Sequence, residues 1–178
     1  MTAIRDLATA RRVHVTESLA AVGQVARFAG PVADVGSGGG APGFPLASAL
    51  PSRELTLLEA SSRKCAFLER WATEFPNVSV VHGRAEKQEP ERFGVAVAKA
   101  LAPPPVAAEW CLGLVAPGGA AILFVGPTAD GERVALVAGR LGGGPPEAHS
   151  GLLVIPKLRP LPPGFPRRVG VARKRPLA

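Results

Sequence analysis

The chain has 178 residues, of which 47% are hydrophobic and 20% charged, a balance typical of a globular protein with one compact domain. No run of about 18 uninterrupted apolar residues occurs, so we expect no membrane span. The first residues mix acidic and basic side chains without an apolar block, which argues against a signal peptide and favours a cytoplasmic protein. The formal net charge is +7, and the excess lies in the C-terminal segment.

After a lead-in over residues 1–30 that we expect to be helical, a short apolar strand, Val32–Val35, runs into a glycine-rich loop. Five of the eight residues from Gly36 to Gly43 are glycine, and glycine adopts positive φ without a steric penalty. The backbone there can turn sharply and approach a ligand closely. The next predicted strand, Glu54–Glu59, ends in a carboxylate 19 residues after Gly40, where it would meet ribose hydroxyls. Together the two signals predict a nucleotide-like ligand.

The glycine loop also satisfies the dinucleotide pattern GxGxxG from Gly38 to Gly43, which alone is weak support for any one ligand. A dehydrogenase would need a second region for its substrate, and the chain leaves little room for one. S-adenosylmethionine is the alternative ligand. Asp34, just before the turn, favours it, because a carboxylate repels a pyrophosphate but suits a ligand that carries an ammonium and a sulfonium.

Strands and helices alternate through the rest of the chain. The further strands are predicted at Val78–His82, Val95–Lys99, Ala120–Val125 and Gly151–Ile155, and the helices at Ser62–Phe75, Pro105–Leu114 and Asp130–Leu141. This alternation predicts an α/β fold, a single Rossmann-like domain with a mostly parallel sheet and helices on both faces. In such sheets ligands bind beyond the carboxyl ends of the strands.

The side chains inside these helices point to packing. Phe67, Trp71 and Phe75 follow helical spacing, and we interpret them as core residues. Cys65 and Cys111 lie in predicted helices without a CxxC or His/Cys cluster, so we expect two reduced core thiols and no metal site.

Residues 157–178 form a basic, proline-rich tail after a domain that we expect to end at residue 156. The tail has seven basic residues and no acidic one, and the rest of the chain has fourteen of each. Clustered Lys and Arg release counterions when they bind nucleic acid, so the tail is expected to contact RNA phosphates. A solvated tail without a partner is the alternative. The candidate RNA-binding residues are Arg167, Arg168, Arg173, Lys174 and Arg175.

Six segments, in this order and spacing, resemble the bacterial small-subunit (16S) ribosomal RNA guanine-N7 methyltransferase family, known as RsmG or GidB. They are IRDLATARRVHVTESLA, DVGSGGGAPGFPLA, LLEASSRKCAFL, VVHGRAE, AKALAP and FPRRVGVARKRPL. The resemblance extends through almost the whole chain. It implies a class I S-adenosylmethionine-dependent methyltransferase domain that methylates guanine N7 in 16S rRNA or in the small ribosomal subunit. We expect a monomer without membrane association.

The resemblance also implies a set of cofactor contacts. Gly36, Gly38 and Ala41 would contact S-adenosylmethionine at the loop and Glu59 would contact the ribose. Ala85 and Glu86 would lie on the adenine side and Lys99 at the far edge of the pocket.

Methyl transfer from a sulfonium is an in-line displacement, in which the protein mainly positions the two reactants. Guanine N7 carries a lone pair and no proton at neutral pH, so attack there needs no general base. The sequence agrees, because it offers no Ser/His/Asp or Cys/His arrangement. We therefore expect catalysis by positioning, with Lys99 as the one candidate for a catalytic side chain.

The chain departs from the family's pattern at Lys99, where arginine is usual, and at Val125, where lysine is frequent. Members of the family also have a further N-terminal helical segment. Two other hypotheses therefore stay open at this stage. One is a methyltransferase of the same fold that acts on a protein or a small molecule. The other is a non-catalytic RNA-binding relative that keeps the fold and the tail.

Overall fold

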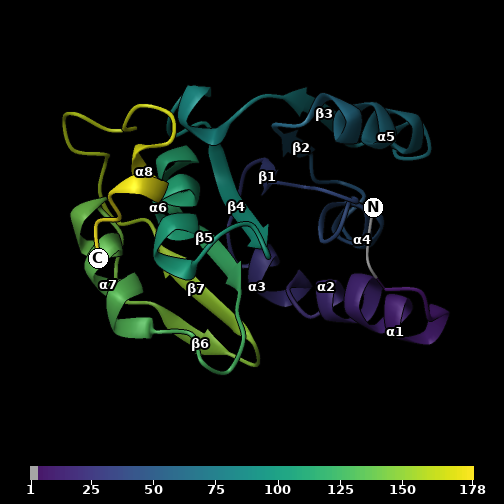
Figure 1. The fold of residues 1–178 in the computed structure, drawn as a ribbon, viewed down its shortest axis with the longest axis horizontal. Coiled ribbons are helices and arrows are strands. Elements are labelled where there is room, and N and C mark those ends of the chain that lie inside the picture. Colours follow the sequence, from purple (N-terminus) through teal and green to yellow (C-terminus); the bar gives the residue numbers. More distant parts are fainter. Residues whose placement is uncertain (1–3) are drawn as a thin grey trace.

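Seven strands form one sheet in the computed structural model, which describes residues 4–178. The order across the sheet is β3-β2-β1-β4-β5-β7-β6 (Figure 1). The strands are β1 (Val32–Val35), β2 (Leu55–Glu59), β3 (Val78–His82), β4 (Phe93–Lys99), β5 (Val115–Phe124), β6 (Glu147–His149) and β7 (Leu152–Pro156). The helices are α1 (Leu7–Arg11), η1 (Arg12–Thr16), α2 (Glu17–Leu19), α3 (Val22–Ala26), α4 (Gly43–Ala49), α5 (Ser62–Ala72), η2 (Ala85–Lys87), α6 (Pro104–Leu114), α7 (Gly131–Arg140) and α8 (Val171–Lys174).

The pairing of the strands confirms the predicted mostly parallel sheet. β1 to β5 run parallel, whereas β7 is antiparallel to β5 and β6 is antiparallel to β7. The sheet order reverses between β1 and β4, and a reversal of this kind opens a crevice at the carboxyl ends of the two strands. Val35 and Lys99 end these strands, so the glycine loop and the segment after β4 leave the sheet side by side.

Helices cover both faces of the sheet, and each face has its own buried cluster. Apolar residues of α6, α7 and α8 pack on one face, and residues of α3 and α4 pack on the other. Figure 1 shows α8 beside α6, far from α1. None of the helices within residues 4–178 has the length and apolar content needed to cross a membrane.

The structure corrects part of the prediction for α5. Cys65 and Leu68 of this helix are buried and Phe75 packs against the core, but Trp71 is 49% exposed. Phe67 and Trp71 are one turn apart and contact each other, with ring centroids at 6.4 Å, on the outer side of the helix. Of the three aromatic residues predicted for the core, Phe75 packs against it, whereas Trp71 is exposed and the half-buried Phe67 contacts Trp71.

Lys157, the first residue of the basic tail, is anchored in the protein interior. Its side chain is fully buried, and its ammonium donates to the carbonyl oxygens of Leu112 at 3.1 Å and Leu141 at 2.7 Å. These carbonyls belong to the C-terminal turns of α6 and α7, where a cation is favourable. The carboxylate of Glu91 lies 3.6 Å away and also accepts from the backbone N–H of Leu161. Burial lowers the pKa of Lys157.

We predict that Lys157→Met lowers the free energy of unfolding by about 3 kcal/mol, because it leaves two buried carbonyls without their donor and the Glu91 carboxylate without its cation. Urea unfolding measures the change. Lys174→Met is the matched control, since it removes the same charge from an exposed position of the same segment. Equal effects of the two substitutions would contradict the anchoring role of Lys157.

Candidate cofactor site

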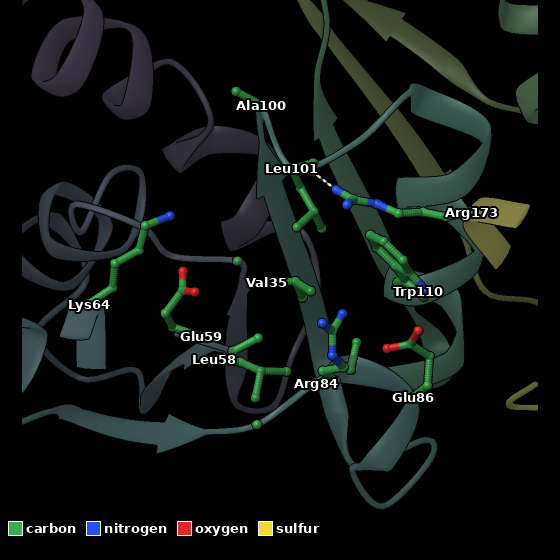
Figure 2. A pocket seen from close by; sticks show the side chains of 14 residues that line it. Val35, Leu58, Glu59, Lys64, Arg84, Glu86, Ala100, Leu101, Trp110 and Arg173 are labelled. Carbon is green, nitrogen blue, oxygen red and sulfur yellow. Dashed lines mark hydrogen bonds between the residues drawn. The ribbon is translucent and has the colours of Figure 1, made fainter. Parts of the chain in front are cut away.

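A cavity of about 270 Å³ opens at the carboxyl ends of β1, β2 and β4. Figure 2 shows Glu59 and Lys64 on one side of it and Leu101, Trp110 and Arg173 on the other. The cavity therefore lies at the crevice that the sheet order creates. Its lining residues are Val35, Gly36, Leu58, Glu59, Ala60, Lys64, Gly83, Arg84, Ala85, Glu86, Ala100, Leu101, Trp110 and Arg173.

Glu59 connects the end of β2 to the glycine loop. One carboxylate oxygen accepts from the backbone N–H of Gly38 at 2.9 Å, and the other accepts from Ser61 at 2.9 Å. Each oxygen has two lone pairs, so the carboxylate keeps acceptor capacity toward the cavity. Gly38 has φ +57 and its N–H faces Glu59 from a left-handed turn, which glycine adopts without strain.

Asp34 lies beneath the loop and is buried. One carboxylate oxygen accepts from the backbone N–H of Gly43 at 3.0 Å, and the other has no hydrogen-bond partner among residues 4–178. A Cβ on Gly43 would lie 2.7 Å from the Asp34 carboxylate, so glycine is required for this contact. Burial raises the pKa of Asp34 from 3.8 to about 7, against the opposing hydrogen bond from Gly43.

The opposite wall of the cavity comes from α6 and α8. Trp110 is 8% exposed, and the guanidinium of Arg173 lies over its ring at 5.6 Å from the centroid. This geometry is that of a cation–π contact. Arg173 also donates to the carbonyl oxygen of Leu101 at 3.4 Å. At the floor of the cavity, Glu86 accepts from the backbone N–H of Gly170 at 3.2 Å.

The structure brings four of the eight candidate cofactor residues into the cavity wall, namely Gly36, Glu59, Ala85 and Glu86. Gly38 contacts the site through its bond to Glu59. The other three lie elsewhere. Asp34 does not line the cavity, and its carboxylate accepts from the backbone N–H of Gly43, so its contact with a ligand's ammonium stays a prediction. Ala41 lines a neighbouring apolar groove with Phe44.

Lys99 is likewise outside the cavity. Its ammonium donates to Glu17 at 3.1 Å and to the carbonyl oxygen of Val13, and it lies 5.4 Å from the centroid of the Phe124 ring. It lines an adjoining hollow with Glu17 and Phe124. The Lys99 side chain therefore connects the N-terminal helices η1 and α2 to the ends of β4 and β5. The sequence did not indicate this role.

Four cavity residues with charged or aromatic side chains were missed as cofactor-site residues, namely Lys64, Arg84, Trp110 and Arg173. Arg84 comes two residues after the end of β3, and Lys64 lies in the first turn of α5, which follows β2, so the rule for strand ends could have found them. No local signal marked Trp110. Nearly every residue of α6 is buried, so the sequence of this helix does not indicate which face meets the cavity. Arg173 was assigned to RNA on charge alone.

The C-terminal candidates for RNA binding divide into two groups. Arg167 forms two hydrogen bonds with the Glu109 carboxylate, at 2.7 and 2.5 Å, and Arg173 covers Trp110. The side chains of Arg168, Lys174 and Arg175 are exposed and, in the part of the chain that the structure describes, make no hydrogen bond or ion pair. Three of the five candidates are thus available for phosphates.

The cavity residues fit S-adenosylmethionine. A carboxylate with spare acceptor capacity, Glu59, suits ribose hydroxyls. Apolar side chains that include Leu58, Leu101 and Trp110 offer surfaces for a flat base. Within residues 4–178, no three His, Cys, Asp or Glu side chains group together in a way that could hold a metal ion.

Comparison with known proteins identifies relatives of this chain. Residues 1–137 match the family described as GidB, rRNA small subunit methyltransferase G. The chain is 38% identical to the ribosomal RNA small subunit methyltransferase G of Rubrobacter xylanophilus, over 85% of this chain and 66% of that protein. It is 36% identical to the protein of the same name from Moorella thermoacetica, over 99% of this chain and 82% of that protein.

Solved structures with the same fold are methyltransferases. An S-adenosylmethionine-dependent O-methyltransferase from Thermotoga maritima has a TM-score of 0.65 and 15% identity, over 81% of this chain and 65% of that one. Magnesium protoporphyrin IX methyltransferase from Synechocystis, solved with bound S-adenosylmethionine, has a TM-score of 0.63 and 15% identity, over 87% of this chain and 85% of that one. These likenesses establish the fold.

The pKa of Asp34 predicts how stability depends on pH. Its folded-state pKa of about 7 lies above the ordinary 3.8, so its favourable contribution is complete below the ordinary value and is lost as the pH rises through about 7. Asp34→Asn keeps an acceptor for Gly43 and does not titrate. We expect the variant to gain stability over the parent between pH 4 and pH 8, by on the order of 4 kcal/mol. Urea unfolding at several pH values measures the difference, and a constant difference would contradict the buried carboxyl.

Proposed function

The chain belongs to the rRNA small subunit methyltransferase G family and is an S-adenosylmethionine-dependent methyltransferase, and on this premise we propose that it methylates guanine N7 in 16S rRNA. The observation that carries the proposal is the cavity itself. It joins the glycine loop, the Glu59 carboxylate and the segment after β4 at the carboxyl ends of three parallel strands. Strand ends of this kind bind nucleotide-like ligands.

We assign the cofactor contacts from the cavity walls. The Glu59 carboxylate accepts from ribose hydroxyls while it keeps its bonds to the loop. Ala85 and Trp110 bound the space for the adenine. Gly36 has φ +73 and lies at the turn nearest the methionine part of the cofactor. When bound, the cofactor supplies a methyl group on a positively charged sulfur.

Apart from Glu59 and Glu86, the carboxylates of the described chain lie outside the cavity wall, and both of these accept from backbone N–H groups. Guanine N7 needs no base, because no proton leaves it before the methyl group arrives. The residues of the chain therefore act by orienting the two reactants and by excluding water. Ala100 and Leu101, in the segment after β4, line the cavity, and we propose that the guanine base enters beside them.

Cations near the cavity support an RNA substrate. Lys64 and Arg84 line the cavity, and the exposed Arg168, Lys174 and Arg175 lie on the segment that closes its other side. Together they give the approach to the cavity a positive charge, which attracts the phosphate backbone. The substrate is accordingly proposed to be 16S rRNA, free or in the small ribosomal subunit.

We propose that the protein acts as a monomer in the cytoplasm, where ribosomal RNA is modified, and without membrane association.

The proposed function is tested by methyl transfer. Purified protein is incubated with tritium-labelled S-adenosylmethionine and either small subunits, naked 16S rRNA or large-subunit RNA, and the nucleosides are then separated. We expect label in 7-methylguanosine from small-subunit RNA alone. Label in another nucleoside would overturn guanine N7 as the target, and bound cofactor without label in any RNA would overturn the substrate.

Substitution of Glu59 tests the ribose contact. We predict that Glu59→Ala weakens cofactor binding roughly 10- to 150-fold, the equivalent of about 1.5–3 kcal/mol for a charge-assisted hydrogen-bond pair. Glu59→Gln keeps an acceptor and the side-chain volume, so it should retain part of the affinity. Calorimetry measures both constants. A change below twofold for Glu59→Ala would exclude Glu59 from the site.

Gly38 has a matched control in Gly118. Both have positive φ, +57 and +89, and a Cβ at either position meets no atom closer than 3.7 Å, so alanine imposes similar backbone strain. Only Gly38 lies at the cavity, where its N–H holds Glu59. We predict that Gly38→Ala lowers cofactor affinity and that Gly118→Ala does not. Equal affinities of the two folded variants would contradict our placement of the loop.

The exposed cations of the C-terminal segment set the salt dependence of RNA binding. Replacing Arg168, Lys174 and Arg175 together by glutamine removes up to three phosphate contacts. The slope of log K against log salt should then become shallower by about 2–3. RNA binding at several salt concentrations measures the slope. An unchanged slope would show that these residues do not contact RNA.

A further inference from the structure

The C-terminal segment, residues 164–178, supplies part of the wall of the cofactor cavity. Arg173 lies over Trp110 and donates to the carbonyl oxygen of Leu101, and the backbone N–H of Gly170 donates to Glu86. The three residues that it contacts, Trp110, Leu101 and Glu86, all line the cavity. The shape of the cavity therefore depends on where this segment lies.

An ion pair between Arg167 and Glu109 holds the segment against α6, next to these contacts. Arg167 and Glu109 form a two-point interaction, and their side chains are only 19% and 6% exposed. Arg167 also donates to the backbone carbonyl of Arg175 at 2.9 Å, which folds the segment back on itself. Glu109 precedes Trp110 in α6, so the pair holds the segment next to the residue that Arg173 covers.

The same short segment carries cations on its outer side. Lys174 and Arg175 follow Arg173 directly, and Arg168 follows Arg167. All three are exposed. Arg173 and Gly170 contact the cavity wall, whereas the three cations face solvent. The docked position of the segment therefore suits both a ligand in the cavity and a polyanion outside it.

We propose that cofactor binding and rRNA binding favour each other through this segment, and that Arg173 is the positioning residue that connects them. The proposal rests on the proposed function and specifies the regulation of its site. Arg173 contributes to the wall that a cofactor contacts only when the segment is docked on α6. Phosphates bind more tightly to cations that the docked segment holds in place. Both ligands therefore stabilise the docked position, and linkage requires the effect to be reciprocal.

The experiment measures the fluorescence of Trp110, which lines the cavity, to detect cofactor binding. The chain has two tryptophans, and the exposed Trp71 is first replaced by phenylalanine so that fluorescence reports on Trp110 alone. S-adenosylmethionine is titrated into this protein with and without saturating 16S rRNA. We expect RNA to raise the affinity for the cofactor roughly fivefold or more, the lower end of coupling between two sites. The affinity for RNA should rise by the same factor when the cofactor is present.

Arg173→Gln is then compared with Lys174→Gln in the same background. Each removes one positive charge from an exposed position of α8, but only Arg173 contacts Trp110 and Leu101. We expect Arg173→Gln to shift the emission of Trp110, to weaken cofactor binding and to abolish the coupling. Lys174→Gln should weaken RNA binding alone. Arg173→Lys, which keeps the charge over the ring, should restore part of the coupling.

Two results would overturn the proposal. One is an affinity for the cofactor that RNA leaves unchanged. The other is equal behaviour of Arg173→Gln and Lys174→Gln, which would reduce Arg173 to a general contribution of charge. Failure of the proposed function is seen separately, as 16S rRNA that does not bind the parent protein or as bound cofactor without methyl transfer to any RNA; the coupling is therefore measured with RNA that the parent protein binds and methylates.

Discussion

The Glu59 carboxylate joins the two segments on which the cofactor site depends. It ends β2 and accepts from the backbone of the glycine loop after β1, so neighbouring strands are tied together at the edge where the cavity opens. Asp34, within β1, accepts from the backbone N–H of Gly43 and so fixes the other end of the loop. A loop so rich in glycine would otherwise sample many conformations, at an entropic cost to any ligand that needs one of them. The two carboxylates hold the loop in place before a ligand binds.

The basic residues between positions 157 and 178 have three different roles, which the net charge does not reveal. Lys157 is buried and neutralises the ends of α6 and α7. Arg167 pairs with Glu109, and Arg173 covers the wall of the cavity. The remaining exposed cations are available for RNA. The excess of seven charges in the sequence thus includes residues with internal contacts, and only part of it is left for the RNA contacts that we propose.

Much of the fold could be predicted because its signals are local. β1 and β3 were predicted with their observed bounds, and β2, β4, β7, α6 and α7 to within two residues, because apolar runs and turn residues mark them. β5 begins five residues before its predicted start, and α5 ends three residues before its predicted end. β6, only three residues long, gave no such signal. Glu59 and Gly36 were found from the order of motifs along the chain. The positions of Lys99, Trp110 and Arg173 depend on contacts between segments far apart in sequence, which no local pattern encodes. The assignment of the site to S-adenosylmethionine came from the resemblance to a family together with the loop.

The central claim is that the cofactor lies between the Glu59 carboxylate and the Trp110 wall. A crystal structure with S-adenosylhomocysteine, the product that remains after methyl transfer, tests it most directly. The account predicts ribose hydroxyls within hydrogen-bond distance of Glu59 and the adenine beside Ala85 and Trp110, with Arg173 still over the indole ring. A ligand bound elsewhere, or bound with Glu59 turned away from the ribose, would contradict it.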